Sequence, residues 1–471
     1  MGNTNRNWLL AAATVMLASA GATPDAPEAT ALTPAAPDPA PPAAIAEPVA
    51  ADTLSVPEPQ FTPDGVAALE ARMAQFVADG DVAGIDTLLV QGDQVISRSM
   101  AGIRKAETGA PITEDTIYRI YSMTKPVTGV AMMMLYEEGA FALDDPITDY
   151  FPEFEALQVY TGPGEDGAPG FVPVSRPATM GELMSHQAGF AYGLFGDDPA
   201  NTGMRETQVF ASEDLDTFID KVAGIPLLFQ PGDAWYYSVA VDIQGAFIER
   251  ATGMTLGEFF DTRIFTPLGM VDTGFHVPEE DYDRFSDVWG YHPETGAFGP
   301  VLGVPGVMFK AETVAMESGG GGLVSTMDDY ARFAAMLLNE GELDGVRLLE
   351  PETVELMRTN VLPDGVVVNT TGNMTETEEV TQRFALNFGV YENTAENGLP
   401  MGEGTYYWGG AAGTWFWVDP VNDLYFIGMI QRFRQNGPLV DFWGVSAEHL
   451  YGAMEEPAGE TVAQKPAEDP A

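Results

Sequence analysis

The sequence predicts an α+β protein, within the broad α/β class, in which one antiparallel sheet flanked by helices is built from both ends of the chain. A mostly helical domain is inserted between the two groups of strands. Two observations predict this arrangement. Apolar or alternating segments typical of strands occur at residues 84–90 and 94–99, and again at residues 406–418 and 424–431. Between them, roughly residues 140–340 alternate helix-like segments with loops rich in glycine and proline.

The first element is expected to be a helix that begins at Pro63, because proline is well tolerated in the first turn of a helix. Val66, Leu69, Met73 and Phe76 follow at helical spacing and share one face.

Turn residues separate the remaining elements. The first two strands form a predicted hairpin with its turn at residues 92–93, and the last two strands bracket a turn at residues 419–423. A long apolar helix is expected over residues 127–136 and ends near Gly139.

The N-terminus has the pattern of a secretory signal peptide, residues 1–22. Arg6 supplies the positive charge, residues 8–17 are a short apolar run, and small residues at 18–20 or 20–22 offer a cleavage site. This pattern predicts a secreted or periplasmic protein, and an uncleaved N-terminal anchor is the alternative interpretation. No later segment is long and apolar enough to predict an integral membrane domain.

The globular domain is expected to span residues 58–455. Residues 23–57 consist largely of alanine and proline and are predicted to be a disordered linker. Residues 456–471 have a similar composition and are predicted to be a disordered tail.

Composition excludes several classes of function. The chain has no cysteine, which excludes disulfides, thiolate metal sites and cysteine nucleophiles. Its formal net charge of −49 repels nucleic acid and anionic membrane surfaces, so neither is expected as a partner. No His, Asp or Glu cluster has convincing metal spacing, so we expect no metal and no cofactor. The oligomeric state is left open.

Residues 120–125, with the sequence Ile-Tyr-Ser-Met-Thr-Lys, carry the first chemical signal. Ser122 lies at the expected start of a helix, and Lys125 lies three positions later, on the same face. A desolvated lysine can accept or relay a proton, so Lys125 could activate the Ser122 hydroxyl as a nucleophile. A helix-capping serine beside a surface lysine is the alternative interpretation.

Two further elements accompany this pair. A Pro-Gly turn at residues 231–232 leads into an aromatic run that includes Tyr236 and Tyr237 and precedes an apolar helix at residues 241–249. Near the C-terminus, a Trp-Gly-Gly triplet at residues 408–410 lies on an expected strand. Glycines there would allow a ligand to approach the backbone closely.

Together these elements resemble the serine β-lactamase superfamily, which includes class C β-lactamases, D-alanyl-D-alanine peptidases and family VIII carboxylesterases. Residues 179–190 and 318–330 are also similar to conserved stretches of that superfamily, and the elements occur in the same order. The resemblance implies a β-lactamase/transpeptidase-like fold.

The resemblance also implies roles for individual residues. Tyr237 corresponds to the tyrosine that acts as general base, with Tyr236 as the rival phenol. The backbone N–H groups of Ser122 and Ala411 correspond to the oxyanion hole. Trp408, Gly409, Gly410 and Val239 correspond to positions that contact the substrate.

Two departures from the β-lactamase pattern indicate the substrate. Val239 stands where β-lactamases have an asparagine, and Trp408 stands where they have the lysine that holds a substrate carboxylate. Without that cation, an apolar pocket favours neutral esters, and family VIII carboxylesterases share the Trp-Gly-Gly triplet. We therefore expect a carboxylesterase-like serine hydrolase. The alternatives are a β-lactamase or D-alanyl-D-alanine carboxypeptidase, an acyltransferase or transesterase, and a catalytically inactive binding protein of the same fold.

Two other features are expected to be structural. His186 lies in one of the family-like stretches, but no Gly-x-Ser-x-Gly motif exists with which it could form a Ser-His-Asp triad. The glycines at residues 319–322 lack the lysine and hydroxyl residue of a phosphate-binding loop, so they predict a tight loop beside the active site.

Overall fold

The structure is a computed structural model that describes residues 61–194, 196–301, 314–368, 382–433 and 437–454. The predicted signal peptide, linker and tail lie outside these ranges. Within them, no helix is both long and apolar enough to cross a membrane.

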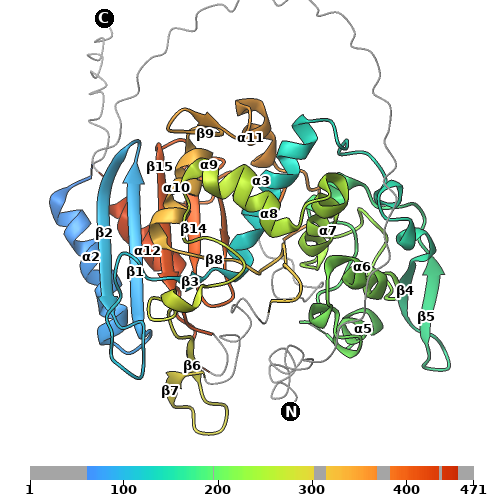
Figure 1. Cartoon of the computed structure of the whole chain (residues 1–471), viewed down its shortest axis with the longest axis horizontal. Coiled ribbons are helices and arrows are strands. Elements are labelled where there is room, and N and C mark those ends of the chain that lie inside the picture. Colours follow the sequence, from blue (N-terminus) through green and yellow to red (C-terminus); the bar gives the residue numbers. More distant parts are fainter. Residues whose placement is uncertain (1–60, 195, 302–313, 369–381, 434–436, 455–471) are drawn as a thin grey trace, which may run out of the picture.

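The core of the molecule is a seven-stranded antiparallel sheet that joins the two ends of the chain, as predicted (Figure 1). The N-terminal hairpin pairs with the last strand through the register Ile85↔Ile430 to Gln91↔Leu424. In spatial order the strands are β11 (Gln382–Phe384), β12 (Gly389–Tyr391), β13 (Tyr406–Gly409), β14 (Trp415–Asp419), β15 (Leu424–Ile430), β1 (Gly84–Gln91) and β2 (Gln94–Gly102).

The expectation of one strand over residues 406–418 is wrong. The chain turns between β13 and β14, because the Gly410 N–H donates to the Thr414 carbonyl and Gly413 adopts a left-handed φ of 88°. Strands β11 and β12 were not predicted, since each is only three residues long and carries little periodic signal.

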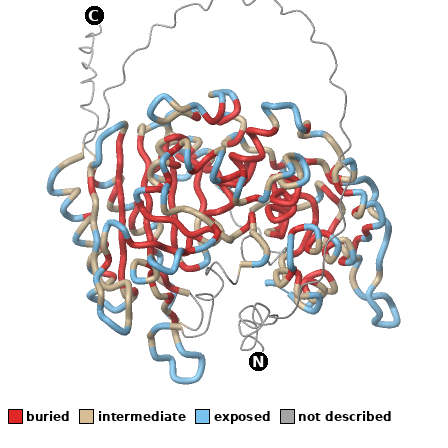
Figure 2. Tube along the Cα trace, in the orientation of Figure 1, coloured by how far each residue is buried: buried red, intermediate tan, exposed pale blue. Residues whose placement is uncertain are grey.

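Helices cover both faces of the sheet. Trp415 and Phe416 are consecutive in β14 and therefore point to opposite faces. Trp415 contacts Phe442 of α12 (Phe442–Gly452), which packs with α2 (Pro63–Ala78), whereas Phe416 contacts Tyr330 of α10 (Met327–Leu338). Because both faces are covered, every residue of β1 is buried (Figure 2).

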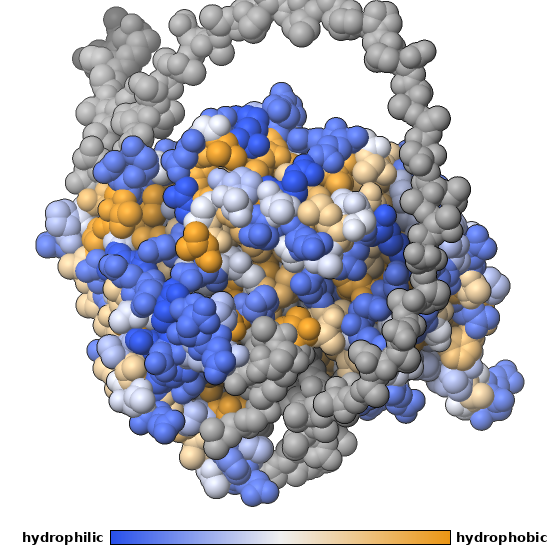
Figure 3. Space-filling model, viewed as in Figure 1, coloured by the Kyte–Doolittle hydropathy of each residue, from blue (hydrophilic) through white to orange (hydrophobic). Residues whose placement is uncertain are grey.

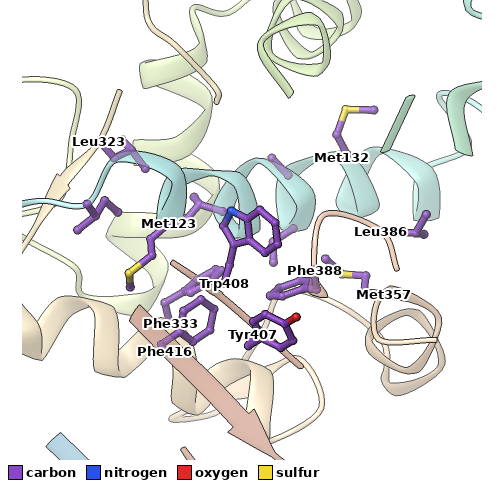
Figure 4. Packing of buried hydrophobic residues seen from close by; sticks show 14 of the residues in the cluster. Met123, Met132, Leu323, Phe333, Met357, Leu386, Phe388, Tyr407, Trp408 and Phe416 are labelled. Atoms are coloured by element: carbon purple, nitrogen blue, oxygen red, sulfur yellow. The ribbon is translucent and has the colours of Figure 1, made fainter. Parts of the chain in front are cut away.

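Helix α3 (Thr124–Glu137) lies between the sheet and the insertion. Its residues from Thr124 to Leu135 are all buried. Figure 4 shows Met123, just before the helix, and Met132 within it, with Trp408 and Phe388 from the sheet side lying close to the helix. A helix that is buried along nearly its whole length belongs in the centre of a large core.

The insertion is mostly helical, as predicted, but it also contains two hairpins that extend from the body (Figure 1). Its helices include α7, the apolar helix expected after Tyr237. The remaining elements are β3 (Tyr118–Arg119), β4 (Gln158–Pro163), β5 (Pro169–Pro173), α4 (Met180–Met184), α5 (Pro199–Glu206), α6 (Leu215–Ala223), α7 (Ala240–Thr252), α8 (Leu256–Phe260), α9 (Thr266–Leu268), β6 (Trp289–Tyr291), β7 (Phe298–Pro300), β8 (Val324–Ser325), β9 (Glu342–Leu343), β10 (Val346–Arg347) and α11 (Pro351–Met357).

The surface agrees with the acidic composition. Hydrophilic residues dominate the face shown in Figure 3, with apolar residues in smaller groups between them. Such a charged surface keeps a protein soluble.

One acidic side chain is buried inside the sheet. Asp86 of β1 is completely buried and forms a two-point ion pair with Arg98 of β2, with Nε–Oδ1 and Nη2–Oδ2 distances of 3.0 and 3.1 Å. Arg98 also pairs with Asp328 of α10, at 2.6 Å. Burial raises the pKa of Asp86 from 3.8 to about 7, although the Arg98 charge opposes this rise.

This raised pKa predicts a pH dependence of stability. Between about pH 4 and pH 7 the folded protein holds a proton on Asp86 that the unfolded chain releases, so this stabilising contribution is lost as the pH rises. Relative to Asp86→Asn, the wild type should therefore lose stability across this window, by at most about 1.4 kcal/mol per pH unit. Urea unfolding of both proteins at a series of pH values measures the difference.

Asp328→Asn is the matched control, because it removes the exposed partner of the same arginine. Compared with the wild type, Asp328→Asn should change the free energy of unfolding by less than about 1 kcal/mol. This difference should stay nearly constant over the pH range in which the difference between wild type and Asp86→Asn changes. A wild type that gains stability over Asp86→Asn as the pH rises would contradict the prediction.

Candidate active site

The candidate nucleophile lies in a strained turn. Tyr121–Met123 form one turn of 3-10 helix that leads into α3, and Ser122 is half-buried within it. Tyr121 has a φ of 43°, a left-handed conformation that a bulky residue rarely adopts. Such strain persists only where the surrounding structure enforces it, and it is often found at functional sites.

Lys125 lies in the first turn of α3 and is almost completely buried, with 1% of its surface exposed. Its Nζ is 3.4 Å from Ser122 Oγ and donates to the Gly320 carbonyl at 2.5 Å. The serine and lysine are thus adjacent, as the sequence indicated, and the interpretation of Lys125 as a surface residue is wrong.

The glycines at residues 319–322, predicted to form a tight loop beside the active site, lie in a loop that packs against α3. The Thr128 hydroxyl donates to the Gly319 carbonyl at 2.7 Å, and the Leu323 N–H donates to Thr124 Oγ1 at 3.1 Å. A Cβ at Gly320 would lie 2.5 Å from Asp242 Oδ2, so a larger residue there would displace the Asp242 carboxylate. The loop therefore brings a backbone carbonyl to Lys125 Nζ.

Asp242 is a neighbour of the site that the sequence analysis missed. It lies in the first turn of α7, is completely buried, and accepts hydrogen bonds from Ser318 Oγ at 2.5 Å and from the Gly320 N–H at 3.1 Å. Burial raises the pKa of Asp242, while the charge of Lys125 opposes the rise. Asp242 is the one charged residue in the stretch 240–248, and this was the signal that could have revealed it.

Two tyrosine rings flank Lys125. Its Nζ lies 4.6 Å from the ring centroid of Tyr237 and 5.4 Å from that of Tyr192, which the sequence analysis did not single out. Within the described residues, the Tyr237 hydroxyl has no hydrogen-bond partner. The rival phenol, Tyr236, accepts a hydrogen bond from Asn201 Nδ2 at 3.1 Å. Of the two candidate phenols, Tyr237 is therefore the one beside the lysine.

His186 packs against the ring of Tyr237. Its Nδ1 is 2.9 Å from Ser238 Oγ, and its ring centroid is 5.1 Å from that of Tyr237. Burial, together with the nearby charge of Lys125, lowers the pKa of His186 well below its ordinary value, so the ring is neutral. This is the structural placement that the sequence indicated.

Strand β13 and the turn after it form the opposite wall. The Trp408 ring lies 5.6 Å from the Tyr237 ring and 5.4 Å from that of Phe384. Gly410 packs directly on the Ile120 carbonyl, two residues before the nucleophile, and leaves no room for a Cβ. Trp408 is buried beside Tyr237, and Gly410 lies against the nucleophile turn. That Trp408, Gly409 and Gly410 contact the substrate stays a prediction.

The expected oxyanion donors lie in the two turns that meet here. The Thr414 hydroxyl donates to the Ile120 carbonyl at 3.3 Å, which joins the β13–β14 turn to the nucleophile turn. Ala411 is exposed in the β13–β14 turn. That the N–H groups of Ser122 and Ala411 form an oxyanion hole stays a prediction.

Val239 requires a correction. The sequence analysis placed it among the substrate-binding residues, but its side chain is completely buried and its N–H donates to the Ala191 carbonyl. An apolar side chain at this position packs into the core beneath the site, whereas a polar one would need partners there. Its role in this structure is therefore packing.

The described ranges contain no group of three or more His, Cys, Asp or Glu residues arranged to hold a metal ion.

Comparison with known proteins places the chain in a family. Residues 69–448 match the Beta-lactamase family model, and the chain belongs to this family. It is 35% identical over 370 residues to Protein Rv1367c of Mycobacterium tuberculosis, covering 77% of this chain and 89% of the relative. It is 31% identical over 372 residues to Esterase EstB of Burkholderia gladioli, covering 75% and 87%. Family VIII esterase-like proteins are thus among its relatives.

Solved structures show the same fold. The unliganded selenomethionyl simvastatin synthase LovD from Aspergillus terreus matches with a TM-score of 0.70 and 22% identity, over 83% of this chain and 99% of that one. EstCE1, described as a hydrolase with promiscuous acyltransferase activity, matches with a TM-score of 0.65 and 24% identity, over 83% and 98%. The predicted β-lactamase/transpeptidase-like fold is confirmed.

The contact between the two turns predicts a specific sensitivity to substitution. In Gly410→Ala the added methyl group would overlap the Ile120 carbonyl and Thr414 Oγ1, so the turns must separate. We expect a loss of about 1–3 kcal/mol in the free energy of unfolding, measured by urea denaturation. Gly299→Ala in β7 is the control, because nothing lies within 4 Å of its added Cβ and a change within about 0.5 kcal/mol is expected. Equal effects of the two substitutions would contradict the close packing of the turns.

Proposed function

We propose that this protein hydrolyses neutral carboxylic esters through an acyl-enzyme on Ser122, as family VIII carboxylesterases do. The observation that carries the proposal is the position of the buried Lys125 Nζ, 3.4 Å from Ser122 Oγ and against the ring of Tyr237. A hydroxyl beside a buried amine and a phenol is equipped for nucleophilic catalysis.

In the proposed first step, the Ser122 Oγ–H proton passes to the pair formed by Tyr237 and Lys125. The positive charge of a lysine beside the phenol favours the phenolate, which can take that proton. Oγ then attacks the ester carbonyl and forms a new C–O bond, and the carbonyl electron pair moves to its oxygen. The N–H groups of Ser122 and Ala411 stabilise this oxyanion.

The tetrahedral intermediate collapses when the alcohol leaves with the proton held by the same pair. Water then loses a proton to the pair and attacks the acyl group, and Ser122 recovers its proton as the acid departs. Each proton taken in one half of the cycle is returned in the other, so the residues are regenerated.

The preference for neutral esters rests on the wall beside Tyr237. Trp408 occupies the position at which β-lactamases have a lysine, and it presents an aromatic ring in place of a cation. The net charge of −49 also opposes anionic substrates. Relatives include Esterase EstB and the Lovastatin esterase of Penicillium rubens, which is 32% identical over 289 residues.

Acyl transfer to an alcohol is a second candidate. The same acyl-enzyme can be attacked by an alcohol in place of water, and Acyltransferase calJ of Penicillium decumbens is 28% identical to this chain over 286 residues. The two functions differ only in which nucleophile reaches the acyl carbon.

A panel of p-nitrophenyl esters with short to long acyl chains tests the proposal. Wild type should turn over at least one ester, and Ser122→Ala should lower kcat/KM by about a thousandfold or more, because the nucleophile is lost. A fluorophosphonate probe should label wild type on Ser122. Absence of both turnover and labelling in the wild type would favour an inactive binding protein of this fold.

The same protein preparation distinguishes the alternatives. Rapid hydrolysis of nitrocefin with feeble ester turnover would identify a β-lactamase and overturn the preference for esters. An added alcohol that diverts most of the acyl product from acid to ester would identify an acyltransferase.

Adjacent tyrosines offer a matched pair of variants. Tyr237→Phe removes the hydroxyl beside Lys125 and should lower kcat by a hundredfold or more, on the order of a lost general base. Tyr236→Phe removes a hydroxyl that bonds to Asn201 and should leave kcat within about threefold while reducing stability by about 1 kcal/mol. Steady-state kinetics on one good ester, with thermal unfolding of both variants, measures the contrast. The reverse order of effects would assign the base to Tyr236.

A further inference from the structure

Lys125 is a buried residue whose ammonium group needs compensation for its lost hydration. An ammonium group with 1% of its surface exposed has lost nearly all of its hydration, which is unfavourable unless opposite charge and hydrogen bonds replace the water. The Gly320 carbonyl and Ser122 Oγ provide polar contacts to Nζ. Neither of these groups carries a full negative charge.

Asp242 lies at the other side of the same loop. Gly320 is hydrogen-bonded to both side chains. Its N–H donates to Asp242 Oδ1, and its carbonyl accepts from Lys125 Nζ. Ser318 Oγ donates to the same carboxylate oxygen. The other oxygen, Oδ2, is buried and has no hydrogen-bond partner among the described residues.

We propose that Asp242 is the positioning residue and counter-ion of Lys125. It anchors the glycine loop so that the Gly320 carbonyl meets Nζ, and its negative charge stabilises the protonated lysine within the core. The carboxylate does not touch the reacting atoms. Its effect on catalysis rests on the proposed function, whereas its effect on Lys125 can be measured without it.

The other groups around Lys125 do not provide this charge. His186 is neutral, because burial lowers its pKa. Burial raises the pKa of Tyr192 well above its ordinary value, and the Tyr237 ring presents its face to Nζ at 4.6 Å. Asp242 and Lys125 bind the N–H and the carbonyl of the same residue, Gly320, so the carboxylate is the acidic group that lies across the loop from the ammonium.

Removing the negative charge should therefore make it easier for Lys125 to lose its proton. Asp242→Asn keeps an oxygen that can accept from the Gly320 N–H and Ser318 Oγ, so it tests the charge separately from the hydrogen bonds. We expect the titration midpoint of Lys125 to fall by about one pH unit or more, the size of effect that a nearby opposite charge exerts.

Lysine labelled with ¹³C at Cε reports this midpoint directly by NMR. The full chain has only five lysines, and the signal absent from Lys125→Met assigns the one of interest. The measurement requires no substrate.

Asp329→Asn is the matched control. Asp329 is also a buried carboxylate whose pKa burial raises, and one of its oxygens accepts from the Asp272 N–H at 2.7 Å and the Thr273 hydroxyl at 2.8 Å. It thus has the same kinds of hydrogen-bond donor but lies outside the contacts of Lys125. Its substitution should leave the Lys125 midpoint unchanged.

Esterase kinetics supply the second readout. In the proposed mechanism the charge of protonated Lys125 activates Tyr237, so loss of that proton sets the alkaline limb of the kcat/KM profile. This limb should move to lower pH in Asp242→Asn, in step with the Lys125 midpoint, and stay in place in Asp329→Asn. A shifted midpoint in a protein without ester turnover would support the role of Asp242 and contradict only the proposed function.

An unchanged Lys125 midpoint in Asp242→Asn, with both variants losing stability alike, would overturn the proposal and leave Asp242 as a structural anchor. If Asp242→Asn does not fold, the double variant Lys125→Met/Asp242→Asn decides. Recovery of folding would support charge compensation, because removing both charges relieves an uncompensated ammonium. Failure of the double variant to fold would contradict it.

Discussion

The active-site architecture depends on the burial of a charged lysine in the core. Lys125 lies in the first turn of a helix whose next residues are all buried, so its ammonium cannot reach solvent. The hydrogen bond from Nζ to the Gly320 carbonyl replaces part of the hydration that the ammonium group loses there. Helix α3, the glycine loop and the start of α7 are therefore held in one arrangement around a single ammonium group.

The nucleophile turn is constrained from the opposite side. The β13–β14 turn contacts it through the Ile120 carbonyl, which accepts from the Thr414 hydroxyl and packs against Gly410. Lys125 contacts the nucleophile turn through Ser122, and the β13–β14 turn contacts it through Ile120. Between these two contacts, Tyr121 is held in a left-handed conformation. Two segments nearly 300 residues apart thus meet where Ser122 is presented, and the seven-stranded sheet is what brings them together.

Much of this could be predicted from the sequence, because the signals are local. Strand patterns at both ends indicated the sheet, and the spacing of Ser122 and Lys125 placed both side chains on one face. The resemblance of the Tyr237 and Trp408 segments to a known superfamily agreed with this pair. The turn within residues 406–418 was missed, because an aromatic run interrupted by small residues has nearly the same local pattern whether it is one strand or two.

By itself, the sequence determined the fold class, the family, the serine–lysine pair and the absence of a cation at Trp408. These follow from residue identity and from spacings of a few positions. Only the tertiary structure decided that Asp242 shares the glycine loop with Lys125 and that Val239 is buried. The physical reason is that burial and pairing depend on contacts between residues far apart in the chain, such as the 195 positions between Lys125 and Gly320. No local pattern encodes such contacts, because they exist only once the helices and the sheet have packed.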